Sequence, residues 1–341
     1  MTDHHPLARS IPRTGHNTTG GMRTAIVLLL FAVLLTPSLA FSQPAAPACP
    51  PSPAIPSAEE IQAMFTTAKD RGFLWKYDKD GHAGYLFGSI HLGRRDWIVP
   101  GPKTMAALQS SGVIALELDV LDPQIHAQLS DPAKAGIARV TLPPTLQLRM
   151  NAIARRVCAP DGALAALHPL MQLITLTMLQ ARFAELEPGY GSEMFLAGFA
   201  RGAKRPLESL ETAEIQLRAL LAGDVQRIVQ MVESGHTLFE TGRQHVQTQR
   251  LLDVWAASNL DELQRYEEWC ECLSTEADRT YMKGLLDDRN PRLAAGIDRL
   301  TRGGRTVFAA VGALHMVGPN SVPKLLEKMG YKIERVPFRT Y

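Results

Sequence analysis

The sequence predicts an α/β fold of the mixed α+β type, with a central mixed sheet and a large helical insertion. Residues 73–91 contain two strand-like segments joined through Asp80-Gly81, which is a hairpin turn signal. The almost wholly apolar run 113–119 follows a helical segment, which indicates a crossover onto a buried strand. Apolar residues then recur at helical spacing through most of residues 123–290.

Each element has a local signal in the sequence. Ser57 and Glu60 form a capping box that begins a short helix ending near Asp70. Pro206 and the short length of segment 205–211 favour a strand that returns to the sheet between helices. The other predicted helices are 103–110, 144–157, 169–184, 192–201, 213–222, 224–234, 291–300 and 322–328, and the other predicted strands are 73–77, 84–91, 113–119, 306–315 and 331–338.

Residues 1–40 have the layout of a signal peptide. Three arginines precede the apolar run 26–35, and small residues lead to Ala40. Because a run of about ten residues is too short for a ~30 Å hydrocarbon core, cleavage after Ala40 is expected rather than a retained anchor. The expected location is periplasmic or secreted, and the alternative is a mature chain tethered by the uncleaved segment. Met22 is a second candidate start of the chain.

Residues 41–56 form a Pro/Ala/Ser-rich linker, and residues 57–341 form one domain. The linker has no hydrophobic periodicity, so it lacks the apolar surface needed to order itself. No second linker follows, and a hydrophobic content of 45% is sufficient for one large core or two modest ones.

The charge balance argues against a nucleic-acid partner. The chain has 36 basic and 34 acidic residues, and residues 1–40 hold three arginines and one aspartate, so the remainder carries equal numbers of both signs. Binding to nucleic acid depends on a basic surface. The expected partner is therefore a peptide or small-molecule substrate, and no stable membrane span is expected after cleavage.

Four cysteines follow the predicted cleavage site: Cys49, Cys158, Cys270 and Cys272. In an oxidising compartment this even number predicts two structural disulfides, with three possible connectivities. Cys270 and Cys272 lie in a segment that looks helical, so their side chains are expected to point to different sides and find different partners. A Cys-x-Cys metal or redox site is the alternative.

Two distant segments share one local design, in which an apolar strand ends in Gly-x-x-His. The first is Gly88-Ser-Ile-His91 and the second is Gly312-Ala-Leu-His315, and another glycine follows each histidine. Glycine at a strand end permits close approach of backbone or ligand. If the two strands are neighbours in one sheet, the two imidazoles meet at its edge.

Two acids occupy comparable places. Glu117 interrupts the apolar run 113–118, and Glu211 closes the predicted strand at 205–211. A lone buried acid is costly unless it is paired, hydrogen-bonded or bound to a metal. Two histidines and two carboxylates suit a divalent transition metal, which activates water for hydrolysis. The structural alternative is that the histidines are ordinary core or surface residues and that Glu117 caps a helix or pairs with an arginine.

Arg289 and Asn290 precede the helix predicted to begin at Pro291. Asn290 is expected to cap that helix. Arg289 either orients a substrate carboxylate or an active-site acid, or belongs to the cap. The chain has no Gly-x-Ser-x-Gly elbow, P-loop, dinucleotide fingerprint or His-Glu-x-x-His helix, which leaves the common nucleophile, phosphate and zincin chemistries without support.

Several of these features together resemble the TraB/PrgY/GumN family, which is related to the Tiki metalloproteases. The resemblance runs from about Leu74 to Phe338 and rests on Leu74-Trp75, Gly88-Ser-Ile-His91, Leu116-Glu117, Leu210-Glu211-Thr212 with Gln216, Arg289-Asn290 and Gly312-Ala-Leu-His315-Met-Val-Gly318. It implies a fold like that of the erythromycin esterase and ChaN group, in which two related halves supply the paired Gly-x-x-His strands.

For Tiki-like members the resemblance implies metal-dependent peptide hydrolysis. We therefore hypothesise that His91, His315 and Glu117 hold a divalent ion such as Mn²⁺, Co²⁺ or Zn²⁺. Glu117 and Glu211 are the candidate catalytic acids, one completing the metal shell and the other serving as general base. The alternative is a non-catalytic periplasmic protein that binds haem, a peptide or a saccharide in the same cleft.

Overall fold

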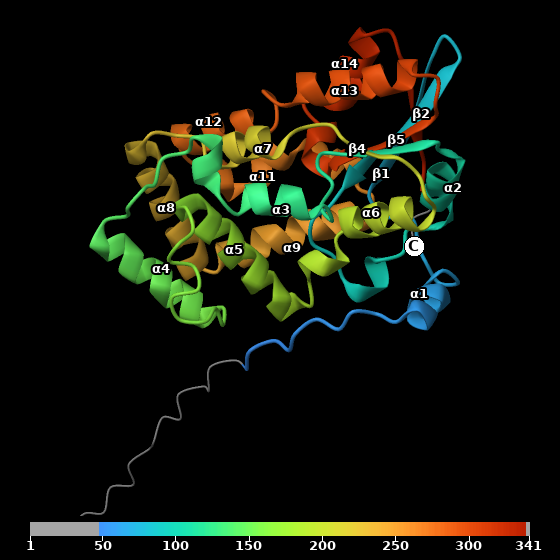
Figure 1. Cartoon of the computed structure of the whole chain (residues 1–341). Helices are drawn as coiled ribbons and strands as arrows, with labels where there is room; N and C mark the ends of the chain where they lie inside the picture. Colours follow the sequence, from blue (N-terminus) through green and yellow to red (C-terminus); the bar gives the residue numbers. More distant parts are fainter. Residues whose placement is uncertain (1–47, 339–341) are drawn as a thin grey trace, which may run out of the picture. The chain divides into compact units, whose positions relative to one another are not determined.

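The computed structural model describes residues 48–338, in which a six-stranded mixed sheet forms the centre (Figure 1). The strands are β1 (Phe73–Lys79), β2 (His82–Ser89), β3 (Val113–Leu116), β4 (Leu207–Ser209), β5 (Val307–Gly312) and β6 (Lys332–Val336). Their order is β4-β3-β5-β2-β1-β6. β1 pairs antiparallel with β2 and β6, whereas β2, β5, β3 and β4 run parallel. The predicted mixed α/β class is confirmed.

The expected signal peptide, residues 1–40, and the first part of the expected linker lie outside the described residues. Within residues 48–338, no helix combines the length and the apolar character needed to cross a bilayer.

Helices occupy most of the remaining chain. They are α1 (Ala58–Met64), α2 (Pro102–Ser110), α3 (Pro123–Leu129), α4 (Pro144–Arg156), α5 (Pro169–Ala181), α6 (Ser192–Gly202), α7 (Ala213–Leu220), α8 (Val225–Glu240), α9 (Arg243–Ala256), α10 (Leu260–Gln264), α11 (Tyr266–Trp269), α12 (Glu276–Leu285), α13 (Asn290–Arg302) and α14 (Val322–Lys328). Ser57 caps α1 with the predicted capping box. α13 and α14 lie above the sheet in Figure 1, and α6 lies below it.

The sheet is covered on both faces, so its central strands are almost wholly apolar. Every residue of β3 is buried, and so is every residue of β5 before Gly312. Parallel strands with two buried faces have this composition. A Cβ on Gly84 would lie 2.7 Å from the Val307 carbonyl oxygen, so β2 and β5 pair closely only because residue 84 is glycine.

The helical region has a second core of its own. Helices α4, α5, α7 and α8 pack around a cluster of buried apolar residues. Its fully or almost fully buried members include Met150, Leu176 and Val232. The described chain therefore contains one core around the sheet and a separate helical core, both within one compact unit that extends from Ala48 onward.

The segment from Cys49 to Pro56 has no helix or strand, in accordance with its proline-rich composition. It is nevertheless attached to the domain. Cys49 forms a disulfide with Cys158, Arg182 Nη2 donates to the Pro51 carbonyl at 2.6 Å, and Tyr190 Oη donates to the Ala54 carbonyl at 2.7 Å. A bridge that closes a loop of roughly 100 residues stabilises a fold by about 4–5 kcal/mol in the chain-entropy description.

The second disulfide joins Cys270 to Cys272, so the expectation that these two cysteines find different partners was wrong. The segment is not one helix, because α11 ends at Trp269 and Cys270 has extended dihedrals of φ −79° and ψ 109°. This turn brings the sulfurs together across the single residue Glu271. A ring this small removes little chain entropy, and so this bridge adds little to global stability.

His236 on α8 is fully buried, and neither ring nitrogen has a hydrogen-bond partner in the described chain. Burial, helped by the charge of Arg149, lowers the pKa of His236 to about 4 from its usual 6.5. The unfolded chain binds this proton below about pH 6.5, whereas the folded chain binds it only below about pH 4. Stability is therefore lost as the pH falls through that window.

We predict that His236→Leu makes thermal stability less sensitive to acid. The variant's Tm should fall less than that of the wild type between pH 6.5 and pH 4, with each kcal/mol corresponding to about 2–4 °C. Calorimetric scans across this range measure the difference. His245→Leu, at a half-buried position on α9, is the control and should follow the wild type. Parallel curves for all three proteins would contradict the assignment.

Candidate functional site

Four parallel strands end at one edge of the sheet, and the predicted site residues follow those ends. β2 and β5 are parallel neighbours, with Ser89 opposite Gly312. Both strands stop before their histidines, because β2 ends at Ser89 and β5 runs into the 3₁₀ turn Ala313–Met316. The strands thus end earlier than predicted, and His91 and His315 lie on the turns that follow. Ligands of open α/β sheets bind at this edge.

Glu117, directly after β3, is buried and makes three hydrogen bonds. Its Oε1 accepts from the backbone N–H of Gly312 at 2.7 Å, which connects the ends of β3 and β5. Its Oε2 accepts from Arg289 Nη2 at 2.6 Å and from Gln216 Nε2 at 3.3 Å. Glu117 is therefore an ionised acid held in place from three directions.

Arg289, at the start of α13, lies between two acids. It donates from Nε and Nη2 to both carboxylate oxygens of Glu211, at 2.5 to 3.1 Å, and from Nη2 to Glu117. The side chains of Arg289 and Glu211 are 9% and 0% exposed. Charge-assisted bonds of this kind are short and strong, and they offset the cost of burying charge. Arg289 therefore contacts the candidate acids Glu117 and Glu211, which is one of the roles that the sequence left open for it.

Two opposing effects set the charge of the acids. Burial would raise the pKa of Glu117, but His315 and the permanent charge of Arg289 outweigh it and lower that pKa to about 2. Burial raises the pKa of Glu211, which Arg289 only partly opposes. Glu117 thus carries the more firmly fixed negative charge of the pair.

His315 is buried and held by Asn290. His315 Nδ1 lies 2.6 Å from Asn290 Oδ1, while Asn290 Nδ2 donates to the Asn320 carbonyl at 2.9 Å. The amide oxygen therefore accepts the Nδ1 proton, and the lone pair is on Nε2. That atom is 3.4 Å from Arg289 Nη1 and 3.9 Å from Glu117 Oε1. Burial lowers the pKa of His315 to about 4, so its imidazole is neutral at pH 7.

The expected cap on the helix was wrong at this position. Asn290 is the first residue of α13, and no side chain caps that helix. The asparagine side chain is instead used to orient His315. A histidine whose Nδ1–H is bound by an acceptor keeps its lone pair on Nε2, as metal-ligating imidazoles do, and in His315 that lone pair faces Arg289 Nη1 at 3.4 Å.

His91 contacts an acid that the sequence interpretation did not select, Glu193. His91 Nδ1 lies 3.1 Å from Glu193 Oε1 at the start of α6. The Glu193 charge raises the pKa of His91 above its usual range, although the His91 side chain is 63% exposed and solvent screens the pair. Ser192 Oγ accepts from the Ile90 N–H at 2.8 Å and so fixes this turn against α6.

A glycine permits this approach between the His91 turn and α6. A Cβ on Gly191 would lie 2.6 Å from the His91 carbonyl oxygen, closer than real Cβ atoms come to backbone. The only sequence signal for Glu193 was its place directly after Gly191-Ser192, at a predicted helix start. Nothing in that local pattern says which histidine the helix start approaches.

A cavity of about 100 Å³ lies among these side chains. It is lined by Ser89, His91, Glu117, Leu118, Val120, Ile125, His126, Leu129, Glu193, Gln216 and Ala310. Glu211, Arg289 and His315 do not line it. Ser89 Oγ and Glu193 Oε1 are both buried, and Glu193 Oε1 lies 3.1 Å from His91 Nδ1.

The donor set fits a divalent transition metal in its chemistry. Two imidazoles and the ionised Glu117 are suitable ligands, and Ser89 and Glu193 add polar oxygens to the cavity lining. Within residues 48–338, however, no three such side chains are gathered into a ligand cluster. Arg289 instead donates to one oxygen of Glu117 and to both oxygens of Glu211.

Comparison with known proteins identifies the family. The TraB/PrgY/gumN family matches residues 73–335, so the chain belongs to that family. Among curated proteins, it is similar to the metalloprotease TIKI1 of Danio rerio, with 23% identity over 313 residues. That match covers 78% of this chain and 63% of the length of the zebrafish protein. No solved structure matches the chain.

Arg289 makes the site's acids compatible with burial, and its removal tests that role. We predict that Arg289→Met lowers the free energy of unfolding by about 3–5 kcal/mol, because two buried carboxylates lose their counterion. Urea unfolding followed by tryptophan fluorescence measures this. Arg299→Met, at an exposed position on the same helix, is the matched control and should change stability by less than about 0.5 kcal/mol. Equal losses in the two variants would contradict the prediction.

Proposed function

We propose that this chain is an exported metal-dependent hydrolase that cleaves peptides. The observation that carries the proposal is the meeting of two Gly-x-x-His turns at adjacent parallel strands, with the ionised Glu117 at the third strand end. The similarity to a protein named as a metalloprotease supports the same class. His91 Nε2, His315 Nε2 and Glu117 are the donors that would hold the ion.

The chain's own residues have separable roles in this proposal. The bound ion supplies Lewis acidity that activates water near neutral pH. Asn290 keeps the proton of His315 on Nδ1, so that the lone pair is on Nε2, and Arg289 Nη1 would have to give up its contact with Nε2 for an ion to bind there. Glu193 lines the cavity and pairs with His91 through Oε1 at 3.1 Å, which makes this acid the candidate to accept a proton from water next to His91. Glu211 is fully enclosed by Arg289, so in this scheme it positions the arginine and Glu193 acts as general base.

We also propose that the sheet comes from two related halves. The support is that β2 and β5 run parallel, pair directly and each lead into Gly-x-x-His followed by glycine. Superposition of residues 84–93 on residues 308–317 in an experimental structure, which aligns the two Gly-x-x-His segments, tests this, and a mismatch in backbone path would argue against it.

A ligand-binding protein without catalysis is the second candidate, in which the cleft holds haem, a peptide or a saccharide. The observation in its favour is that Arg289 already neutralises Glu117 and Glu211, which reduces the need for a metal ion. Under this alternative His91 contacts the ligand, and no turnover occurs.

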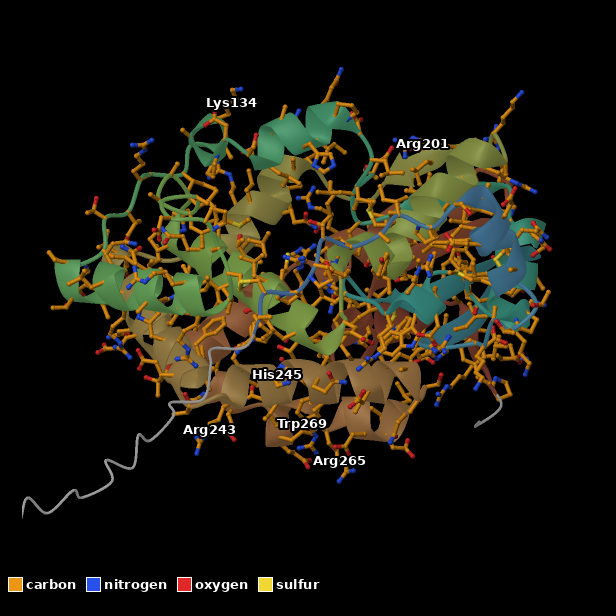
Figure 2. The ribbon with its side chains drawn as sticks, turned by 90° about the horizontal axis from the view of Figure 1, so that it is seen from below. Lys134, Arg201, Arg243, His245, Arg265 and Trp269 are labelled. Atoms are coloured by element: carbon orange, nitrogen blue, oxygen red, sulfur yellow. A yellow bond between two sulfur atoms is a disulfide. The ribbon has the colours of Figure 1, made fainter. Side chains whose placement is uncertain are left out.

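Metal content distinguishes the two candidates. We predict that protein purified without chelators contains Mn, Co or Zn at about one ion per chain, and that His91→Ala/His315→Ala removes it. Elemental analysis by mass spectrometry provides the measurement. His82→Ala/His245→Ala is the matched control; His245 lies on α9, below the sheet in the view of Figure 2. Peptide turnover should be lost on chelation.

Wild-type protein that holds no metal even after addition of these ions would favour the binding protein. Full metal occupancy in His91→Ala/His315→Ala would exclude the two histidines as ligands.

Export is part of the proposal and is supported by the two disulfides, because such bonds persist mainly in oxidising compartments. We predict that N-terminal sequencing of the mature protein begins at Phe41, with the protein periplasmic or secreted. A mature chain that begins at Met1 or Met22 and sediments with membranes would instead indicate the tethered form.

A further inference from the structure

His91 lines two cavities of the described chain, the small one at Glu117 and a second one beside Trp269. The second, which we call the Trp269 cavity, has a volume of about 280 Å³ and is open toward solvent. Its walls come from the chain after β2, from α5 and α9, and from α11 with the turn that follows it. Since the His91 side chain is 63% exposed and belongs to both linings, a ligand bound at its imidazole lies next to both cavities.

The Trp269 cavity is mainly apolar. Among the described residues that line it, only His91 has a side chain that can be charged near neutral pH. Apolar and aromatic side chains form much of the wall: Ile90, Leu92, Leu251, Leu252, Tyr266 and Trp269. Trp269 Nε1 donates to the Glu262 carbonyl at 3.0 Å, so the polar atom of the indole is satisfied within the protein. A charged ligand group would therefore lose hydration here without gaining a counterion.

The polar side chains of this wall are mostly bonded within the protein. Thr177 Oγ1 donates to the Leu173 carbonyl at 3.0 Å. Gln244 Nε2 donates to Thr248 Oγ1 at 3.2 Å. Gln247 Nε2 has no partner in the described chain, but it is buried and is not presented to a ligand. Recognition in this cavity therefore depends on apolar contact more than on hydrogen bonds.

A larger cavity, of about 680 Å³, adjoins the Trp269 cavity. Thr177, Gln244 and Cys272 line both cavities, whereas His91 lines only the smaller one. The larger cavity, which we call the Leu238 cavity, therefore lies further from the candidate site. Its apolar walls come from α5, α8 and α12, through side chains such as Leu173, Ile174, Leu238 and Met282.

The charged side chains at the Leu238 cavity already have partners. Arg243 Nη1 lies 2.6 Å from Glu271 Oε2, and Asp278 accepts from the Thr275 N–H at 3.0 Å in the capping box of α12. Figure 2 shows Arg243 and Trp269 on the same side of the molecule. Both cavities are thus suited to uncharged, apolar groups.

The dimensions fit a peptide in an extended conformation. Gln244 and Leu251 both line the Trp269 cavity, and seven residues of helix correspond to about 10 Å. At about 3.3 Å per residue, that length accommodates roughly three residues of an extended chain. Alternate side chains of such a chain face the same way, so two of them, two residues apart, can enter the two adjoining cavities.

We propose that the Trp269 cavity binds a large apolar side chain of the substrate peptide, close to the bond that is cleaved at His91. The Leu238 cavity binds a second apolar side chain two residues further along the peptide. Burial of one leucine-sized side chain contributes about a tenfold to a hundredfold gain in affinity. The ligand's role as a substrate rests on the proposed peptidase, whereas its binding needs neither metal nor catalysis.

Calorimetric titration of the purified mature chain, with chelator present throughout, tests the binding. The probes are acetyl-(Leu-Ser)₃-amide, whose leucines face one way when it is extended, and the same peptide with Lys or with Glu in place of Leu. The leucine peptide should bind with one site per chain. The lysine and glutamate peptides should bind at least about tenfold more weakly.

A change of one amide to an acid should alter this preference. Gln244→Glu places a carboxylate where the two cavities meet, with almost no change of shape. It should weaken the leucine peptide about tenfold and strengthen the lysine peptide about tenfold. Gln226→Glu is the matched control, because Gln226 is also the second residue of its helix, α8, but is exposed and outside both linings. It should leave both affinities unchanged.

A second pair of variants tests the space itself. Thr248→Trp fills the Trp269 cavity from α9 and should abolish binding of the leucine peptide. Val246→Trp, on the same helix but 63% exposed and outside both linings, should bind it normally. Unchanged Tm values confirm that each variant is folded.

Cleavage of a mixed peptide library by metal-loaded protein tests the link to the proposed function. Mass spectrometry of the products should show large apolar residues at a fixed position from the cut, and Gln244→Glu should shift that position toward Lys and Arg. Binding as expected without any cleavage would refute the hydrolase and leave the two cavities assigned. Cleavage with no apolar preference, or with a preference that Gln244→Glu does not alter, would do the reverse.

Three binding results would overturn the proposal. They are the absence of measurable binding of the leucine peptide to the wild type, equal affinity for the leucine and lysine peptides, and normal binding of the leucine peptide by folded Thr248→Trp.

Discussion

The buried charge of Arg289 is the interaction on which the site depends. The guanidinium joins Glu117 after β3, Glu211 after β4 and the imidazole of His315 after β5. These groups come from segments far apart in sequence, and each would be costly to bury alone. The arginine therefore fixes both the spacing of three strand ends and the charge state of the acids. The same contact limits the ability of Glu117 to bind another cation.

The two histidines have different electrostatic environments, although their local sequences match. His315 is enclosed, neutral and oriented by Asn290, whereas His91 is largely exposed and next to the charge of Glu193. The His315 ring is thus held in one orientation, whereas the His91 ring lies on the solvent side of the cleft. The helical region adds the outer wall, since α3 supplies Leu129 and Ile125, and α6 supplies Glu193.

Much of the fold was predictable because hydrophobic periodicity and the residues that mark turns and caps are local features of the sequence. The hairpin, the β3 crossover and the returning strand after Pro206 were all found from short patterns. Helices α9 to α12 were not separated in advance, because their boundaries depend on caps and turns within one polar, mainly helical stretch. At the site, the sequence pointed to His91, Glu117, Glu211, Arg289 and His315, and the structure brings all five to one edge of the sheet. It could not reveal the partners Glu193 and Asn290, since both are set by tertiary packing.

The strand order has a consequence for the timing of assembly. β5 lies between β2 and β3, although it follows both by most of the domain's length. The first strands to be synthesised therefore have an open slot between them, and long-range pairing of this kind forms slowly. His315 and Arg289 arrive only with the last part of the chain. A partly synthesised chain therefore has no complete site, and any activity of the site can begin only after the whole chain has been made.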